Sequence, residues 1–157
     1  KISFNYKLLE KINPHIAHIG VGIAIIGITC SSVFKIEYDF NISEGDKLEI
    51  EDINIVFEKI NITNESNFQA LRANFLIKKN NEVVAKIKAG KNFYPVSKMI
   101  TSEAGILHQW SRDIYFILGD QKDNIWFVKI FINPFVSFIW LGVIIMVLSG
   151  LVGVNKR

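Results

Sequence analysis

Two uncharged apolar runs, at 16–34 and 134–154, enclose a polar middle in which apolar residues recur at every second position. With a rise of about 1.5 Å per residue, each run is long enough as a helix to cross a hydrocarbon core of roughly 30 Å. A period of two residues is typical of β-strands. The pattern therefore predicts an integral membrane protein whose two transmembrane α-helices flank a small antiparallel all-β extracytoplasmic domain, barrel- or sandwich-like.

The first half of the middle has the clearest strand pattern. Apolar residues alternate over 53–57, and a slip of phase before Ile60 predicts a β-bulge. The alternation returns over 71–77, and 79–82 is predicted to be a hairpin turn because it is short, polar and rich in asparagine. Glu44-Gly45-Asp46 is the first clear turn. These features predict consecutive antiparallel strands.

The second half of the middle is less regular. The stretch 97–112 does not alternate, and we expect a long loop with a helical turn there. Beyond it we expect a short strand marked by Tyr115 and Ile117 that ends at Gly119, a loop at 120–124, and a strand with Trp126, Val128, Ile130 and Ile132 on one face.

Basic residues at the two ends predict the orientation. Lys1, Lys7 and Lys11 precede the first run, and Lys156 and Arg157 follow the second. Short basic flanks mark the cytoplasmic side of a membrane protein, and long translocated domains are exempt from that count. We therefore expect a cytoplasmic segment at 1–14, a transmembrane helix at 15–34, a β-domain at 35–132 in the periplasm or an equivalent space, a second transmembrane helix at 133–154 and a cytoplasmic tail at 155–157.

Composition narrows the function classes. The 157 residues carry a net charge of +3, and the basic residues are scattered along the predicted strands, so no nucleic-acid partner is expected. The single Cys30 cannot form an internal disulfide and is interpreted as a small buried hydrophobe. Because the sequence starts with Lys1 and not methionine, we expect it to be a fragment or a processed piece of a longer protein.

Two histidines stand at the start of the first apolar run. His15 and His18 are three residues apart and therefore lie on nearly one face of a helix. A histidine within an apolar membrane run is costly in lipid, so it is a functional candidate by default. The residues alone leave three interpretations open: a metal ion shared by both, an axial haem ligand at His18, or a hydrogen-bonded packing histidine. His15 follows Pro14, and we expect it in the first helical turn.

The middle segment offers little catalytic chemistry. It has no nucleophile–base pair at a recognisable spacing, no Gly-rich phosphate loop and no metal-ligand cluster. Ser102, Glu103 and His108 are close in sequence, but no glycine-elbow pattern surrounds them. Glu103 is interpreted as a loop carboxylate held by nearby backbone amides. No catalytic residue is therefore predicted.

Several short segments follow one another in a fixed order along nearly the whole chain. They are Ala17-His18-Ile19-Gly20-Val21-Gly22, Ile26-Gly27-Ile28, Glu44-Gly45-Asp46, Lys91-Asn92-Phe93-Tyr94-Pro95, Ser102-Glu103-Ala104, Arg112-Asp113-Ile114-Tyr115, Leu118-Gly119, Trp126, Asn133-Pro134-Phe135-Val136 and Ile139-Trp140-Leu141-Gly142. In their order and spacing these segments resemble the C-terminal region of CcmF, the haem lyase subunit of cytochrome c maturation system I. The chain is thereby identified as a member of this family.

The resemblance implies the last portion of a polytopic protein of the inner membrane, either the bacterial plasma membrane or the mitochondrial inner membrane, with the β-domain on the periplasmic side. It implies that this protein takes part in covalent haem attachment to apocytochrome c. It implies four partners: the haem chaperone CcmE, CcmH-type subunits, apocytochrome c and the remainder of the parent membrane protein. It also implies a haem b held between transmembrane histidines, one of them in an H-x-G motif. That iron ligand falls on His18, whereas His15 matches no family motif.

The sequence departs from the family pattern at Asn133, which replaces a lysine, at Phe138, which replaces a tryptophan, and at His108, where the family has no histidine. The family's tryptophan-rich loop and its other histidines belong to an earlier part of the protein, so this chain alone is not expected to be a complete enzyme. Two alternatives stay open. One is the paralogous haem lyase subunit for nitrite reductase, and the other is a non-catalytic, membrane-anchored β-domain that docks partner proteins.

Overall fold

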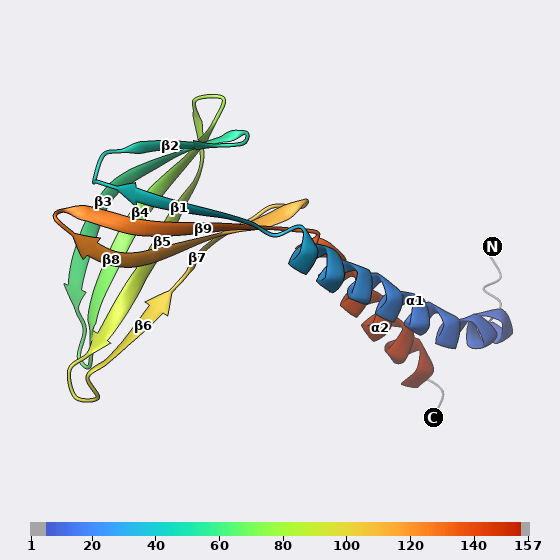
Figure 1. Ribbon diagram of the computed structural model, residues 1–157. Helices are drawn as coiled ribbons and strands as arrows, with labels where there is room; N and C mark the ends of the chain where they lie inside the picture. Colours follow the sequence, from blue (N-terminus) through green and yellow to red (C-terminus); the bar gives the residue numbers. More distant parts are fainter. Residues whose placement is uncertain (1–5, 155–157) are drawn as a thin grey trace. The chain divides into compact units, whose positions relative to one another are not determined.

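The computed structural model describes the backbone of residues 6–154 and the side chains of residues 13–152 (Figure 1). The terminal basic residues that predict the orientation lie outside the described side chains. The elements are α1 (Tyr6–Val33), β1 (Ile36–Ile42), β2 (Lys47–Ile50), β3 (Ile53–Asn64), β4 (Gln69–Lys79), β5 (Glu82–Tyr94), β6 (Met99–Glu103), β7 (Gly105–His108), β8 (Arg112–Lys122), β9 (Ile125–Pro134) and α2 (Val136–Val154).

The chain divides into a helical unit and a β-unit. The helical unit contains α1, α2 and the short segment 110–112, and the β-unit contains 36–109 and 113–132. The prediction of two helices flanking an antiparallel all-β domain is confirmed.

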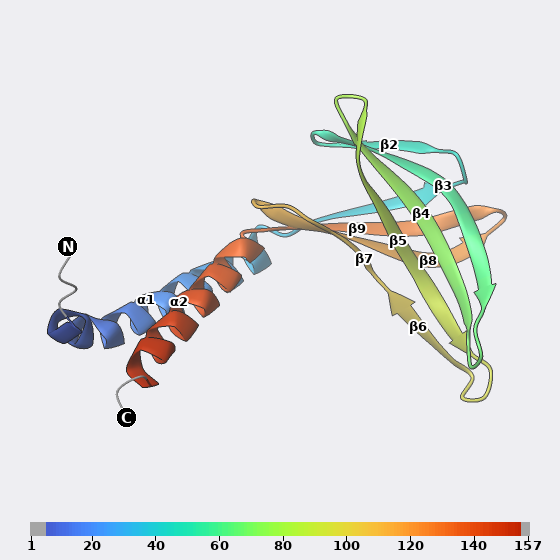
Figure 2. The same ribbon diagram turned by 180° about the vertical axis from the view of Figure 1, so that it is seen from behind.

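The β-unit is a sandwich of two antiparallel sheets (Figures 1 and 2). One sheet has the order β1-β9-β8-β7 and the other the order β2-β3-β4-β5-β6. Phe75 of β4 lies at the centre of the core between them, with its ring centroid 5.2 Å from that of Phe57 and 5.3 Å from that of Phe116 on β8. All three phenylalanines are fully buried. Aromatic contacts therefore join the two sheets at the middle of the sandwich.

The turn chemistry of the first half follows the sequence prediction. The turn between β4 and β5 consists of Asn80 and Asn81, whose φ angles are 50° and 65°. Positive φ at both central residues is the geometry of a tight hairpin turn, and asparagine tolerates it better than most residues. The predicted bulge is also confirmed, because the register of β3 against β4 shifts between Phe57 and Lys59.

The acidic turn before β2 holds this bulge in place. Gly45 has a φ of +93°, which favours glycine, and its N–H donates to the carbonyl of Phe57 over 2.6 Å. The Glu44 carboxylate accepts a hydrogen bond of 2.8 Å from the N–H of Ile60, just beyond the bulge. Glu44 thus satisfies a backbone donor next to the irregularity in the β-ladder.

Replacing Glu44 by alanine is expected to lower the free energy of unfolding by about 1 kcal/mol, because the Ile60 N–H loses its acceptor at a partly solvated site. Glu44→Gln retains a side-chain oxygen and should lose less. Urea unfolding of the protein in detergent measures both, with Glu65→Ala as an exposed control. Equal stability of Glu44→Ala and the wild type would show that water replaces the carboxylate.

Two predictions for the second half are wrong. The strand expected to end at Gly119 runs on to Lys122, and the connection to β9 is a two-residue turn at Asp123 and Asn124, with φ angles of 52° and 63°, where a longer loop is predicted. The segment 120–124 is polar, which is typical of a loop, so the sequence pattern ends the strand too early. Its first three residues, 120–122, nevertheless belong to β8.

The stretch 97–112 is likewise not one long loop, because it contains β6 and β7. Four of the five residues of β6 are exposed, so the strand has no buried face to impose a period of two. It pairs through its backbone with β5, from Gly90 opposite Glu103 to Tyr94 opposite Met99. An edge strand of this kind is defined by its hydrogen bonds and leaves little pattern in the sequence.

Small residues let the two helices of the helical unit approach closely. Gly20, Ala24 and Gly27 of α1 are buried. A Cβ added to Gly20 would lie 2.9 Å from the Gly142 carbonyl oxygen of α2, and one added to Gly142 would lie 2.5 Å from the Gly20 carbonyl oxygen. Backbone contact at this distance is possible only for glycine, so these positions fix where the helices meet.

Hydrogen bonds also join α1 and α2 further along the same interface. The Asn13 side-chain amide donates to the Ser149 carbonyl over 2.9 Å, and the Ser149 hydroxyl lies 2.8 Å from the Asn13 carbonyl oxygen. Ser149 is only 4% exposed. The hydrogen-bonding groups of this buried serine are therefore satisfied by Asn13 of the opposite helix.

The first helix starts earlier than predicted. It begins at Tyr6, so Pro14 lies inside it and His15 is not in its first turn as expected. Proline removes one backbone hydrogen bond but does not end this helix, because the apolar run continues beyond it. Among the described residues, Asn13–Val33 is long and apolar enough to cross a membrane by length and composition, and Val136–Val152 is a shorter apolar helix.

Candidate functional site

His18 sits within the apolar part of α1 with a defined ring orientation. Its Nδ1 lies 2.6 Å from the carbonyl oxygen of Pro14, one helical turn earlier. A carbonyl oxygen can only accept, so Nδ1 must carry the proton in this contact. In the neutral imidazole Nε2 then has a lone pair, and a histidine held in this way can offer that nitrogen to a metal.

His18 faces away from the second helix. It lies two residues before Gly20, about 200° around α1, and Gly20 is one of the positions in contact with α2. In agreement with this, His18 is exposed. Whatever binds His18 must therefore approach α1 on the side opposite α2.

The described residues offer no further metal ligands around His15 and His18. Both histidines are exposed, and within the described part of the chain no group of three or more histidine, cysteine, aspartate or glutamate side chains could hold a metal ion. Structural zinc needs about four such ligands. A single imidazole in an apolar setting would fit a different role, that of one protein ligand to the iron of a haem, whose porphyrin would supply the other nitrogen ligands.

In the β-unit, Glu103 is part of a side-chain network and not of a loop. One of its carboxylate oxygens lies 2.8 Å from Arg72, and the other accepts 2.6 Å from the Asn92 amide. Arg72 also donates to the Asn92 side-chain oxygen over 2.7 Å. The interpretation of Glu103 as a carboxylate held by backbone amides is therefore wrong. Its partners are side chains on β4 and β5, which sequence distance conceals.

His108 is paired with a buried carboxylate that sequence analysis did not identify. Its Nδ1 lies 3.1 Å from Asp113, whose side chain is 7% exposed while that of His108 is 71% exposed. The two residues are opposite each other in the β7–β8 ladder. Burial and the Asp113 charge both raise the pKa of Tyr115, in that order of size. We interpret the pair as a structural contact that satisfies a buried carboxylate.

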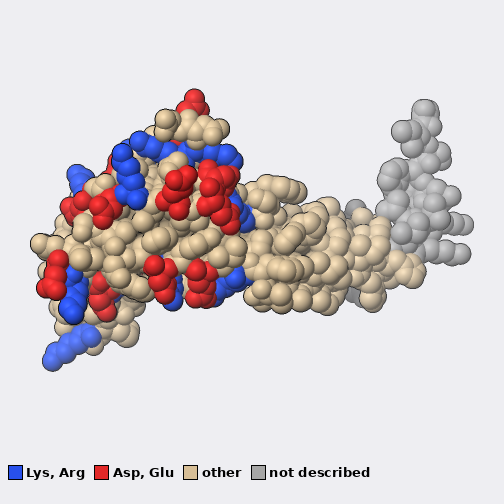
Figure 3. Space-filling model, turned by 45° about the horizontal axis from the view of Figure 1, so that its top comes forward, with Lys and Arg blue, Asp and Glu red and all other residues tan. Residues whose placement is uncertain are grey.

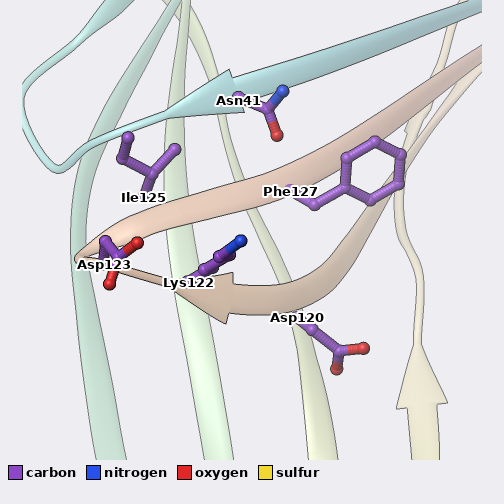
Figure 4. Close-up of a pocket in the computed structure, with 6 residues that line it drawn as sticks. All are labelled: Asn41, Asp120, Lys122, Asp123, Ile125 and Phe127. Carbon is purple, nitrogen blue, oxygen red and sulfur yellow. The ribbon is translucent and has the colours of Figure 1, made fainter.

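A hollow of about 380 Å³ lies at the turn between β8 and β9 (Figure 4). It has charged side chains of both signs on its rim. The hydrogen bond from Lys91, 2.6 Å long, and the charge of that lysine lower the pKa of the exposed Asp120 carboxyl. No nucleophile–base pair is present among the residues that line it: Asn41, Asp120, Lys122, Asp123, Ile125 and Phe127. His18 is therefore a stronger candidate for a functional site than this hollow.

Comparison with known proteins adds relatives along most of the chain. CcmF of Haemophilus influenzae, a cytochrome c-type biogenesis protein, is 33% identical over 143 residues, which are 90% of this chain and 22% of that protein. The corresponding CcmF of Escherichia coli K12 is 29% identical over 136 residues, 86% of this chain and 21% of that protein. The cytochrome c-type biogenesis protein NrfE of Haemophilus influenzae is 26% identical over 147 residues, 93% of this chain and 23% of that protein.

The same comparison bears on the fold. A solved structure named Cytochrome c Heme Lyase CcmF superposes with a TM-score of 0.77 at 14% sequence identity, and it covers 95% of this chain and 25% of that one. The fold is therefore shared with that protein. The chain spans about a fifth of the length of the curated relatives it matches.

The family described as the CcmF C-terminal beta-sandwich matches residues 33–134, from the last residue of α1 to the end of β9. This match includes every described strand of the sandwich and well over half of the chain. The protein therefore belongs to the CcmF C-terminal β-sandwich family.

Proposed function

We propose that this chain is the C-terminal part of a CcmF-type cytochrome c assembly factor and that His18 ligates the iron of a haem b held in the membrane. The observation that carries the proposal is the His18 ring, whose Nδ1 is engaged by the Pro14 carbonyl at 2.6 Å. Its other nitrogen is free on an exposed face of an apolar helix. A bound haem would supply a redox-active iron, and the chain would supply one ligand and its orientation.

The proposed membrane placement rests on the distribution of charge. The described side chains of α1 and α2 include no lysine, arginine, aspartate or glutamate, whereas these residues cover the strands in the view of Figure 3. Together with the apolar length of Asn13–Val33, this favours helices in lipid and a sandwich in water. We propose that the protein lies in the inner membrane and that the sandwich is periplasmic.

The proposed partners follow from family membership. They are the remaining segments of the CcmF-type protein, the haem chaperone CcmE, CcmH-type subunits and apocytochrome c. His18 would supply one ligand of the haem iron, and we propose that a second histidine is supplied by another segment of the CcmF-type protein. The chain would thus act as one side of a composite site.

The test is the visible spectrum of the assembled protein purified from membranes, oxidised and dithionite-reduced. Replacing His18 by alanine is expected to lower the b-type haem signal per protein by about tenfold or more, because an iron ligand is removed. His15→Ala is the matched control and should retain the signal. Added imidazole should partly restore the signal in His18→Gly, which a purely structural role would not produce.

An unchanged haem signal in His18→Ala would overturn the assignment. It would favour the second candidate, a membrane-anchored β-domain that docks partner proteins. Under that candidate His15 and His18 variants should behave alike, and the haem content of the assembly should not depend on either.

A further inference from the structure

The three glycines in the apolar part of α1, Gly20, Gly22 and Gly27, differ in whether helix packing requires a glycine there. A Cβ on Gly20 would meet the Gly142 carbonyl oxygen at 2.9 Å, and a Cβ on Gly27 would meet the Ile139 nitrogen at 2.7 Å. Helix packing therefore requires both of them. A Cβ on Gly22 would have no neighbour within 4 Å. Glycine is among the least favourable residues in a helix interior, so packing against α2 leaves Gly22 unexplained.

Gly22 shares its face with His18. It is four residues further along, so it lies on the same side of α1, one turn on and opposite α2. The next residue along this side is Ile25, which is 57% exposed, and Val21 beside it is 43% exposed. Gly22 thus leaves this side of the helix without a side chain between His18 and Ile25.

We infer that Gly22 provides the clearance that a flat macrocycle needs when His18 holds it, and that it is a positioning residue of the proposed haem site. This inference rests on the proposed function and deepens it. A macrocycle bound through a side-chain nitrogen extends sideways over the helix surface on which that side chain stands. A large residue one turn away would occupy the same space, and a glycine would not.

The experiment compares Gly22→Leu, Gly22→Val and Gly150→Leu in the assembled protein purified from membranes. Gly150 is the matched control, because it lies in the apolar helix α2 and a Cβ there also has no neighbour within 4 Å. The haem-to-protein ratio and the reduction midpoint potential are measured for each. Gly22→Leu is expected to lower the ratio by about five- to tenfold, as overpacking of a close contact does, and Gly22→Val by less.

Gly150→Leu is expected to retain the wild-type ratio and potential. A wild-type ratio and potential in both Gly22 variants would overturn the inference. So would an equal loss in Gly150→Leu, which would indicate a general effect of added bulk. A low yield of Gly22 variants with an unchanged ratio would assign Gly22 to contact with another helix.

The His18→Ala measurement distinguishes a failure of the Gly22 assignment from a failure of the proposed haem site. Loss of haem in His18→Ala with normal haem in the Gly22 variants would remove this inference alone. Normal haem in His18→Ala would remove the proposed function itself.

Discussion

Replacing Phe75 by alanine is expected to destabilise the β-sandwich by about 3–5 kcal/mol. Its ring lies at the centre of the core, 5.2 Å from the Phe57 ring on the neighbouring strand and 5.3 Å from the Phe116 ring of the facing sheet. The change removes a fully buried side chain and leaves a cavity between three strands that cannot easily collapse. A domain typically has a total stability of about 5–15 kcal/mol, so much of it would be lost.

Hydrogen exchange of the protein in detergent measures this effect, because amides of β4 and β8 should lose protection while those of α1 and α2 keep theirs. The control is Val96→Ala, since Val96 is an apolar side chain that is 97% exposed. Phe75→Leu should lie between the two. Wild-type protection in Phe75→Ala would contradict the assignment of the sandwich core.

Replacing Gly142 by leucine is expected to separate the two helices. A Cβ at this position would meet the Ala24 nitrogen at 2.7 Å as well as the Gly20 carbonyl oxygen at 2.5 Å. These neighbours are backbone atoms, which cannot move aside as the end of a flexible side chain can. The paired hydrogen bonds between Asn13 and Ser149 should break at the same time, because both belong to this interface.

Spin labels at Val21 and Val143, both exposed side chains, report the separation when Cys30 is replaced by serine. Gly142→Leu should lengthen and broaden the distribution of label distances, whereas Gly150→Leu should leave it unchanged. The same narrow distribution in all three proteins would mean that close backbone contact does not hold the pair together.

The sequence predicted those parts of the fold in which one face of an element is buried and the other is not. The β4 strand is an example, because Ala73, Phe75 and Ile77 are buried and alternate with less buried residues. Its turn into β5 was predictable too, since asparagine is favoured at positive φ. Both features are encoded within a few neighbouring residues.

Elements defined by partners far along the chain were not predictable in the same way. The strand β6 is mostly exposed and exists because β5 pairs with it. The β8 strand is apolar on both faces: Ile114, Phe116 and Leu118 are buried, while Tyr115 and Ile117 alternate with them. A period of two cannot locate the end of such a strand, because the polar residues 120–122 that follow the apolar ones still belong to β8.

The candidate site shows a similar division. His18 stood out in the sequence because a histidine in an apolar run is unusual. Its ring orientation and its position opposite α2 required the structure. The roles of the glycines also required the structure, because only the neighbours of Gly20, Gly22 and Gly27 show which of them pack against α2.

The pairing of β1 with β9 has a consequence for the order of folding. These strands are the first and the last of the sandwich, and they pair from Ile36 opposite Ile132 to Ile42 opposite Trp126. A ribosome must therefore complete almost the entire β-unit before the β1 edge can be covered, and α2 follows only a few residues later. Pairing between strands that are far apart in the sequence is slow. The nascent chain therefore passes through a late stage in which β1 has not yet paired with β9, and its unpaired edge is then open to chaperones or to misassembly.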